Sequence, residues 1–313
     1  MDFQDGKRDG RLNSDGVFFP YPLLYSPTLK TNTKIDALVP WSPDFAAGQP
    51  MYEPLLPLIG QFAAFREWPG LDSYQQLLDA QPQPIRLLSG QALKIVPQEG
   101  RAHRFADHYA PRIYMTGEVQ TRTRNWHDFF QFLTWFIFPR TKALINAIHI
   151  PRARARLEQG GDPGRRSPVE NMLSLFDEGG TLVLSSDPSL LQLIRDFQWK
   201  ELFWQRREVM QEALQCITFG HAMYEKGLRP YLGMTANSIL LEVEPGFFGK
   251  PMAERLAWCD GQLAAIFERG DRYQKPRDLS PFPILGMPDW DPDNGREAYY
   301  DNTNYFRPGR KSR

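Results

Sequence analysis

The segment that most constrains this chain runs from Arg124 to Arg140 and reads RNWHDFFQFLTWFIFPR. Seven of its side chains are aromatic, and so apolar a stretch has to be buried, either in a protein core or in a lipid bilayer. Its most apolar part, Phe129 to Phe138, is about half of the roughly 20 residues that a membrane-spanning helix requires. We therefore expect a buried helix of a globular protein and no membrane association.

Polar side chains open this expected helix and follow one side of it. Asn125 is a favourable N-cap, and Asp128 is placed three positions on, where an acid can reach back to the cap. His127, Gln131 and Thr134 are spaced i, i+4 and i+7, which puts them on one stripe of an otherwise apolar helix. This stripe either faces solvent or lines a polar cavity, and the sequence leaves both interpretations open.

A second histidine is expected inside the protein. Helical periodicity extends over about residues 197–226, and one apolar stripe of that segment consists of Met210, Leu214, Ile217, His221 and Tyr224. His221 would then point inward, where Glu225, four residues on, can hydrogen-bond it or share a ligand with it. The alternative is a structural histidine that one carboxylate satisfies.

The remaining patterns mix helices and strands. Strand patterns occupy residues 91–97 and 238–244, and residues 172–186 predict a hairpin that turns at Glu178-Gly179-Gly180. Because strands do not alternate regularly with helices, we predict an α+β fold, a mainly helical single domain over residues 35–313 with a small antiparallel sheet or hairpin. Helices are expected at about residues 53–68, 71–80, 126–148, 197–226 and 251–269.

Three segments lack such periodicity. Residues 1–34 show no apolar face, so we expect a poorly ordered N-terminal tail or arm. Residues 152–168 are rich in arginine, glycine and proline, and predict a loop that serves either as a solvated linker or as a phosphate clasp. Residues 281–310 are too proline-rich for regular structure and too aromatic to stay in solvent, which predicts a C-terminal segment wrapped around the domain.

Composition narrows the class of partner. Lys plus Arg number 37 and Asp plus Glu number 37, so no overall charge attracts nucleic acid, and the expected partner is a small molecule or another protein. Only two cysteines are present, in no metal-binding spacing, and the N-terminus has no apolar signal segment, which together predict a cytoplasmic location. The common nucleotide-binding, zinc-protease and hydrolase motifs are absent from the sequence.

Several acidic residues have ordinary explanations. Asp177 and Glu178 lie in the predicted turn, and turns favour acidic residues and glycine for conformational reasons. The DxDxD stretch from Asp289 imitates the start of a calcium loop, but Asn294 stands where glycine is required and Tyr300 where the bidentate glutamate belongs. A calcium site is therefore not expected.

Three hypotheses for function follow. In a metal-dependent hydrolase, a divalent ion such as zinc, manganese or iron would be held by His127, His221 and one or more of Asp128, Asp177 and Glu225, with Asp177 the expected ligand. In metal-free acid/base chemistry, a buried histidine–carboxylate pair would move a proton. In a non-catalytic binding or scaffold protein, the polar pairs would be structural. For the two enzyme hypotheses, the expected catalytic residues are His127, Asp128, His221 and Glu225, and the expected substrate-binding residues are Arg122, Gln131 and Arg140.

From about Trp68 to Arg310 the chain also resembles a bacterial family called domain of unknown function 3025. The resemblance rests on the motifs TGEVQTR, NWHDFF, FPRTK, LSLFDE, GHAMYE, PFPILGMPDW and YYDNTNYFRP. Gln131 replaces an asparagine usual in the family, Asp289 a glycine and Asn302 an acid. The family assigns no catalytic residue. It does place His127, Asp177, His221 and their acidic neighbours in the motifs that define it, which favours a shared site.

Overall fold

A computed structural model describes residues 35–100, 104–160 and 166–309, so the predicted N-terminal arm lies outside the described residues. The described α-helices are α1 (Ile35–Leu38), α2 (Leu56–Ile59), α3 (Leu71–Asp79), α4 (Tyr109–Thr116), α5 (Trp126–Ile137), α6 (Pro139–Glu158), α7 (Pro168–Gly179), α8 (Pro188–Arg195), α9 (Arg207–Ala213), α10 (His221–Gly227) and α11 (Met252–Arg269). None of the helices in these ranges combines the length and hydropathy needed to cross a membrane.

The strands form two small sheets. They are β1 (Lys94–Pro97), β2 (Glu118–Thr121), β3 (Gly180–Ser185), β4 (Leu214–Thr218), β5 (Thr235–Glu242) and β6 (Ser280–Pro283). Strands β1 and β2 pair in parallel, whereas the main sheet has the order β4-β3-β5-β6. In the main sheet β3 is antiparallel to β4 and parallel to β5, and β6 is antiparallel to β5. The α+β class is confirmed, with a mixed sheet in place of an antiparallel one.

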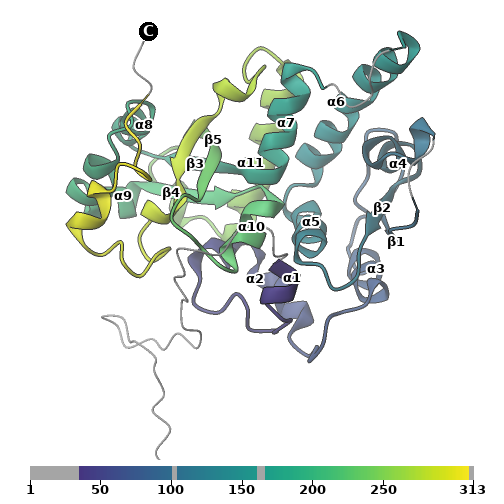
Figure 1. The fold of residues 1–313 in the computed structure, drawn as a ribbon, viewed down its shortest axis with the longest axis horizontal. Helices are drawn as coiled ribbons and strands as arrows, with labels where there is room; N and C mark the ends of the chain where they lie inside the picture. Colours follow the sequence, from purple (N-terminus) through teal and green to yellow (C-terminus); the bar gives the residue numbers. More distant parts are fainter. Residues whose placement is uncertain (1–34, 101–103, 161–165, 310–313) are drawn as a thin grey trace, which may run out of the picture.

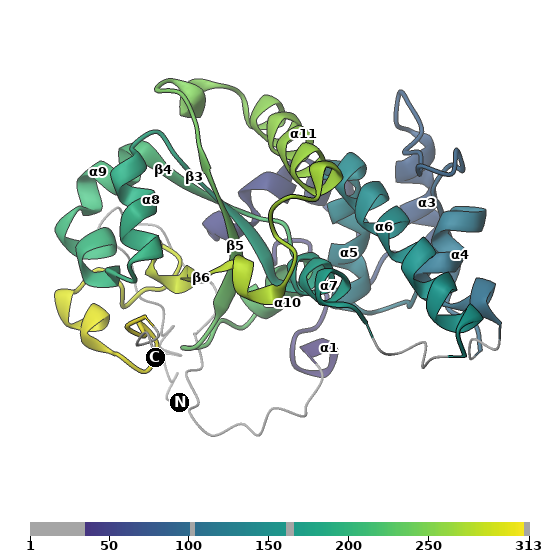
Figure 2. The same cartoon turned by 90° about the horizontal axis from the view of Figure 1, so that it is seen from above.

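The main sheet lies between two groups of helices. Helices α8 and α9 and the C-terminal segment lie on one side of it, and α7, α10 and α11 lie on the other (Figures 1 and 2). Beyond α5 and α6, on the far side from the sheet, α3, α4 and the β1–β2 pair form a smaller group (Figure 1). Helix α5 therefore runs through the middle of the protein, as its aromatic sequence requires.

The predicted long helix over residues 126–148 is two helices. Helix α5 ends at Ile137, Phe138 lies between the two helices, and Pro139 is the first residue of α6, where a proline is favoured because its missing N–H would have no partner. The carboxylate of Asp260 in α11 accepts hydrogen bonds from the backbone N–H groups of Arg140 and Thr141, at 3.0 and 2.8 Å. A buried acid from another helix thus caps α6.

Three further predictions about secondary structure are wrong in whole or in part. Residues 197–226 are not one helix, because residues 214–218 form strand β4 and pair with β3. The hairpin over residues 172–186 is wrong because Asp177 and Glu178 lie in the last turn of α7, which runs directly into β3. The described part of the arginine-rich segment is also helical up to Glu158, so that part of the predicted loop is a continuation of α6.

The aromatic side chains fill the core in two places. Trp126, Phe129 and Phe130 of α5 are fully buried, and Trp126 stacks on Trp41 with ring centroids 5.4 Å apart. In the C-terminal segment, Tyr300 and Phe306 are buried against one another, at 5.2 Å, and against Phe203, which precedes α9. At about 1.5–3 kcal/mol for each fully buried large side chain, both groups are major contributors to folding.

Candidate functional site

The start of α5 fixes the position of His127. Asn125 is the N-cap, and its side chain accepts from the backbone N–H of Asp128 at 3.0 Å, as expected from the sequence. Asp36 in α1 holds this cap from outside, accepting from the Asn125 amide at 2.8 Å and from the Trp126 N–H at 2.7 Å. His127 is thus in the first turn of a helix that is anchored at its N-terminus.

The end of α7 and the start of α10 bring in the second histidine. The backbone N–H groups of Phe219 and Gly220 both donate to the Gly180 carbonyl, at 3.0 and 2.9 Å, which holds the start of α10 against the junction of α7 and β3. Residue 220 has to be glycine, because a Cβ atom there would lie 2.4 Å from the Glu178 carbonyl oxygen. His221 therefore begins α10 directly beside Asp177 and Glu178.

The two imidazoles meet through one nitrogen each. His127 Nε2 and His221 Nε2 are 3.1 Å apart, and the rings are almost perpendicular. The expected proximity of His127 and His221 is confirmed, although the helical stripe that suggested it is interrupted by β4. His221 is only 1% exposed, whereas His127 is partly open to solvent.

Carboxylates lie on the other side of both rings. His127 Nδ1 is 3.0 Å from Glu225 Oε2, and since a carboxylate only accepts, this nitrogen carries the hydrogen. Glu225 therefore holds His127, not His221 as the helical spacing suggested. His221 Nδ1 is buried on the side of Asp177, whose backbone and carboxylate both favour the protonated ring and whose Oδ2 is 3.9 Å away.

Glu178 occupies the side of the site where the two Nε2 atoms meet. Its Oε2 atom is 3.5 Å from His221 Nε2, and one ligand atom from each of His127, Glu178 and His221 lies within 4.8 Å of the others. Glu178 is 53% exposed and thus opens the site to solvent. Asp177, predicted as a metal ligand, instead faces the Nδ1 side of His221, so it cannot share an ion with the two Nε2 atoms.

A buried lysine supports Asp177. Lys142 of α6 is 4% exposed, and its Nζ lies 2.7 Å from Asp177 Oδ1 and 5.4 Å from the centre of the Trp135 ring. A buried ammonium group requires such a partner, because an unpaired charge would cost several kcal/mol. Lys142 thereby fixes the carboxylate that faces His221.

The two histidines have opposite shifts in pKa. Burial lowers the pKa of His221 to about 3, and Lys142 and His127 act in the same direction, whereas Asp177 opposes them. Burial also acts to lower the pKa of His127, but the hydrogen bond to Glu225 and the charge of Glu178 outweigh it, so this pKa is raised. Without an ion, His127 is thus the histidine that gains a proton first.

Asp128 and Arg122 form a separate pair. Asp128 accepts from the Arg122 backbone N–H at 2.7 Å, from Nε at 2.9 Å and from Nη2 at 2.7 Å. Both oxygens of this buried carboxylate are therefore used to hold the segment after β2 against α5. The Asp128 carboxylate therefore has a structural role. Among the described residues, no contact of Asp128 with either histidine supports the predicted catalytic role.

The other predicted substrate-binding residues lie away from the histidines. Gln131 is buried in α5, and its backbone carbonyl accepts from the Thr134 hydroxyl at 2.9 Å, so the Thr134 side chain of the polar stripe is satisfied within its own helix. Arg140 is exposed at the start of α6, beside Gly261 of α11. Neither side chain has a contact with His127 or His221 among those found in the described residues.

Sequence reasoning missed two members of the cluster. Glu178 was attributed to a turn, although its place beside Asp177 near the end of an apolar pattern is also compatible with a helix end. Lys142 gave no signal, because a lysine in an FPRTK segment is expected on the surface, and only the packing of α6 against α7 buries it.

No curated protein and no solved structure matches this chain. A family match covers residues 93–310, which include every member of the histidine cluster, and the family is described as "Protein of unknown function (DUF3025)". The match extends over most of the chain and confirms the resemblance that the motifs suggested. The chain therefore belongs to the DUF3025 family.

Proposed function

We propose that this protein is a metal-dependent hydrolase in which His127, His221 and Glu178 hold one divalent ion. The observation that carries the proposal is the contact between the two Nε2 atoms at 3.1 Å, with a carboxylate on the Nδ1 side of each ring. Histidines that bind metals through one ring nitrogen almost always present the other to a carboxylate, a carbonyl or water. Glu225 and Asp177 fill that position here.

The facing nitrogens need a hydrogen or a metal ion between them. If each Nδ1 carries the hydrogen on the carboxylate side, both Nε2 atoms present lone pairs to each other, and these repel unless a positive charge separates them. In the metal-free protein, a proton on one Nε2 atom satisfies this requirement. A metal ion would replace that proton, since metal binding to histidine releases protons.

The spacing suits an ion of the zinc type. Such an ion lies about 2.0–2.1 Å from each ligating nitrogen, which limits the separation of two ligating nitrogens to roughly 4 Å. The observed 3.1 Å between the Nε2 atoms, and 3.5 Å from His221 Nε2 to Glu178 Oε2, fall within this limit. Two histidines and one glutamate leave a position open for water, which the ion would acidify for attack on a substrate.

Zinc titration of the metal-stripped full chain tests this assignment. We expect one equivalent of Zn²⁺ to bind in competition with a chromophoric chelator. His127→Ala and Glu178→Gln should each reduce the affinity by more than the 10–100-fold that follows from losing an outer hydrogen-bond partner. The matched control is His149→Ala, which removes a partly buried histidine that faces Glu170 at 3.7 Å instead.

Hydrolysis is tested separately. Chromogenic carboxylic and phosphoric esters should be cleaved in a zinc-dependent manner, and Glu178→Gln should abolish the activity. If zinc binds but no ester or phosphoester is cleaved, the metal site stands and the hydrolase assignment fails. If no divalent ion binds, the histidine pair is structural and the scaffold hypothesis takes its place.

We also infer a reducing compartment, the cytoplasm, for this protein. Cys216 and Cys259 are both free and buried, and burial raises the pKa of each thiol to about 12, so neither forms a thiolate readily. Two buried thiols provide no disulfide framework for an oxidising environment. Labelling with a thiol reagent in the folded state should leave both unmodified.

A further inference from the structure

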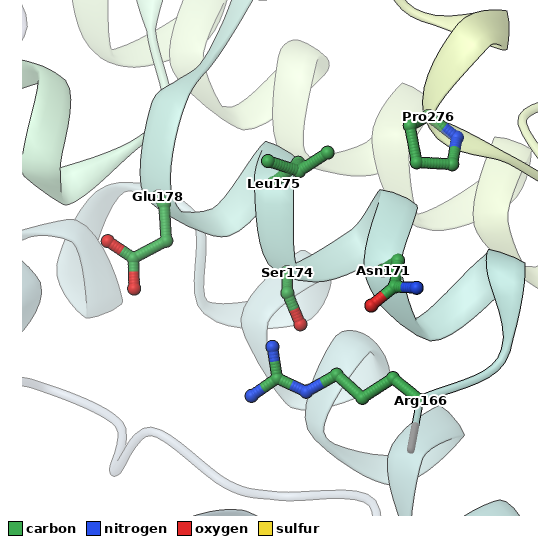
Figure 3. A pocket seen from close by; sticks show the side chains of 6 residues that line it. All are labelled: Arg166, Asn171, Ser174, Leu175, Glu178 and Pro276. Carbon is green, nitrogen blue, oxygen red and sulfur yellow. The ribbon is translucent and has the colours of Figure 1, made fainter. Parts of the chain in front are cut away.

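A groove leads away from Glu178 along α7. Asn171, Ser174, Leu175 and Glu178 share one face of the helix, and with Arg166 and Pro276 they line an open hollow of about 370 Å³ (Figure 3). Glu178 thus belongs both to the histidine cluster and to this groove. A molecule in the groove would have one end beside the candidate metal ligands.

Among the described residues, Arg166 is the one cationic side chain that lines the groove. Figure 3 shows the Arg166 side chain extending along α7 from the N-terminal end of the helix, so that its guanidinium lies below the Ser174 hydroxyl. The Glu178 carboxylate lies further along the same face. The neighbouring Arg156 is different, because its guanidinium is bound by Glu170 through two contacts of 2.5 and 2.8 Å. Within the described ranges, Arg166 has no ion-pair partner.

The nearest acids in α7 are already occupied. Glu170 is held by Arg156 and by Ser167, and Glu178 faces His221. A guanidinium that carries five N–H donors in a planar fork matches a carboxylate or phosphate group. The Arg166 donors make no hydrogen bond with the described residues and lie near a hydroxyl and an amide, which favours an anionic ligand.

The spacing of residues along α7 gives the distance between an anion bound in the groove and the histidine cluster. Ser174 and Glu178 are four residues apart, or about 6 Å at the rise of an α-helix. An anion bound by Arg166 and Ser174 would lie roughly that far from the Glu178 carboxylate. One small substrate can span this distance, with its charged group in the groove and its reacting bond at the ion.

We propose that the α7 groove binds the anionic group of the substrate, through the Arg166 guanidinium and the Ser174 hydroxyl. The substrate class is then an ester or amide that carries a phosphate or carboxylate group a few bonds from the bond that is cleaved. The assignment of substrate class rests on the proposed hydrolase function, but anion binding by Arg166 does not.

Calorimetry with inorganic phosphate and with acetate, on the zinc-loaded and on the metal-stripped full chain, tests the groove. Arg166→Gln should reduce the affinity for the preferred anion at least about tenfold, and Ser174→Ala by less, since a hydrogen bond to a charged group contributes about 1.5–3 kcal/mol. Arg166→Lys should retain part of the affinity. Preference for phosphate over acetate, or the reverse, identifies the anion.

The matched control is Arg152→Gln, which removes an exposed arginine of α6 that donates to its own helix, at Ile148. Anion affinity should be unchanged in this variant, and zinc affinity unchanged in all four. If neither anion binds the native chain, or if Arg166→Gln binds as the native chain does, the groove is not an anion site. If the native chain takes up no zinc in the titration but shows Arg166-dependent anion binding, the metal proposal fails and the anion site stands.

Discussion

The two ends of α7 carry acidic residues in opposite states. At the N-terminal end, Glu170 accepts from both Arg156 Nη atoms and from the Ser167 backbone N–H and hydroxyl, so its carboxylate is saturated. At the C-terminal end, Asp177 is paired with Lys142, and Glu178 is 53% exposed with its Oε2 atom 3.5 Å from His221 Nε2. Because a helix favours anions at its N-terminus and cations at its C-terminus, only the first end is electrostatically favourable.

This difference separates a stabilising network from a binding site. A saturated carboxylate contributes to folding and has no capacity left for a ligand. At the other end, Asp177 is paired with the buried Lys142, but Glu178 has no lysine or arginine partner among the described residues. Its negative charge at the C-terminal end of a helix reduces stability and would be compensated when a cation binds. Sites that bind are often built at such a cost to the free energy of folding.

The largest predicted effect is the loss of Glu170. Burial acts to raise its pKa, but Arg156 and Ser167 outweigh burial and lower it from 4.5 to about 2. Glu170→Gln should therefore reduce the free energy of unfolding at pH 7 by roughly 3 kcal/mol. Urea unfolding measures this change, and Glu158→Gln, an exposed glutamate at the end of α6, is the control. A loss equal to that of the control would show that the network is not stabilising.

The lowered pKa of Glu170 also predicts how the free energy of unfolding depends on pH. Its folded pKa is below its unfolded value, so its contribution is complete above pH 4.5 and disappears as the pH falls towards 2. The difference in stability between the native chain and Glu170→Gln should shrink over that window. His149 faces Glu170 at 3.7 Å, and burial lowers its pKa. Its contribution to the free energy of unfolding therefore also falls in acid, but this histidine is present in both proteins. A difference that stays constant down to pH 2 would contradict the prediction.

At the other end of the helix, the predicted effect is on the metal. Glu225→Gln keeps the size of the side chain but loses the charge that holds His127 Nδ1, so zinc affinity should fall by about 10–100-fold. The free energy of unfolding of the metal-free chain should change little. Chelator competition measures the affinity, and Glu208→Gln on the surface of α9 is the control. Equal zinc affinity in Glu225→Gln and the native chain would remove Glu225 from the site.

The smallest effect has the opposite sign. Glu178→Gln removes a negative charge from the C-terminal turn of α7, and should raise the free energy of unfolding of the metal-free chain by about 0.3–1 kcal/mol. The same substitution should abolish zinc binding, so stability and function would change in opposite directions. A loss of stability in the metal-free chain would mean that Glu178 is a structural partner of His221.

Local sequence signals predicted the elements that depend on local contacts. The N-cap at Asn125, helix α11 and strands β1 and β5 were predicted because capping, helical periodicity and alternation are properties of neighbouring residues. Strand β4 was not predicted. Leu214 and Ile217 fit a helical stripe equally well, and pairing with β3, about 30 residues earlier, determines the strand.

The candidate site was predicted in part for the same reason. His127, His221 and Glu225 were selected because polar side chains in apolar helices need partners, and the structure brings the three together. The choice between Asp177 and Glu178 depended on the end of α7, which the pattern had assigned to a turn. Lys142 and the α7 groove arise only from the packing of α6, α7 and η6 (Pro276–Asp278) and have no local signal.

The direct passage from α7 into β3 has a consequence for the rate and affinity of ion capture. Glu178 directly precedes Gly179 and a strand whose residues are all buried, and Gly220 packs against the same junction, so the backbone beneath this proposed ligand cannot move without disturbing the sheet. An arriving ion would meet groups whose conformational entropy was already lost when the chain folded. Shedding of the ion's own water and release of one proton, rather than any rearrangement of the protein, would then set the speed of binding.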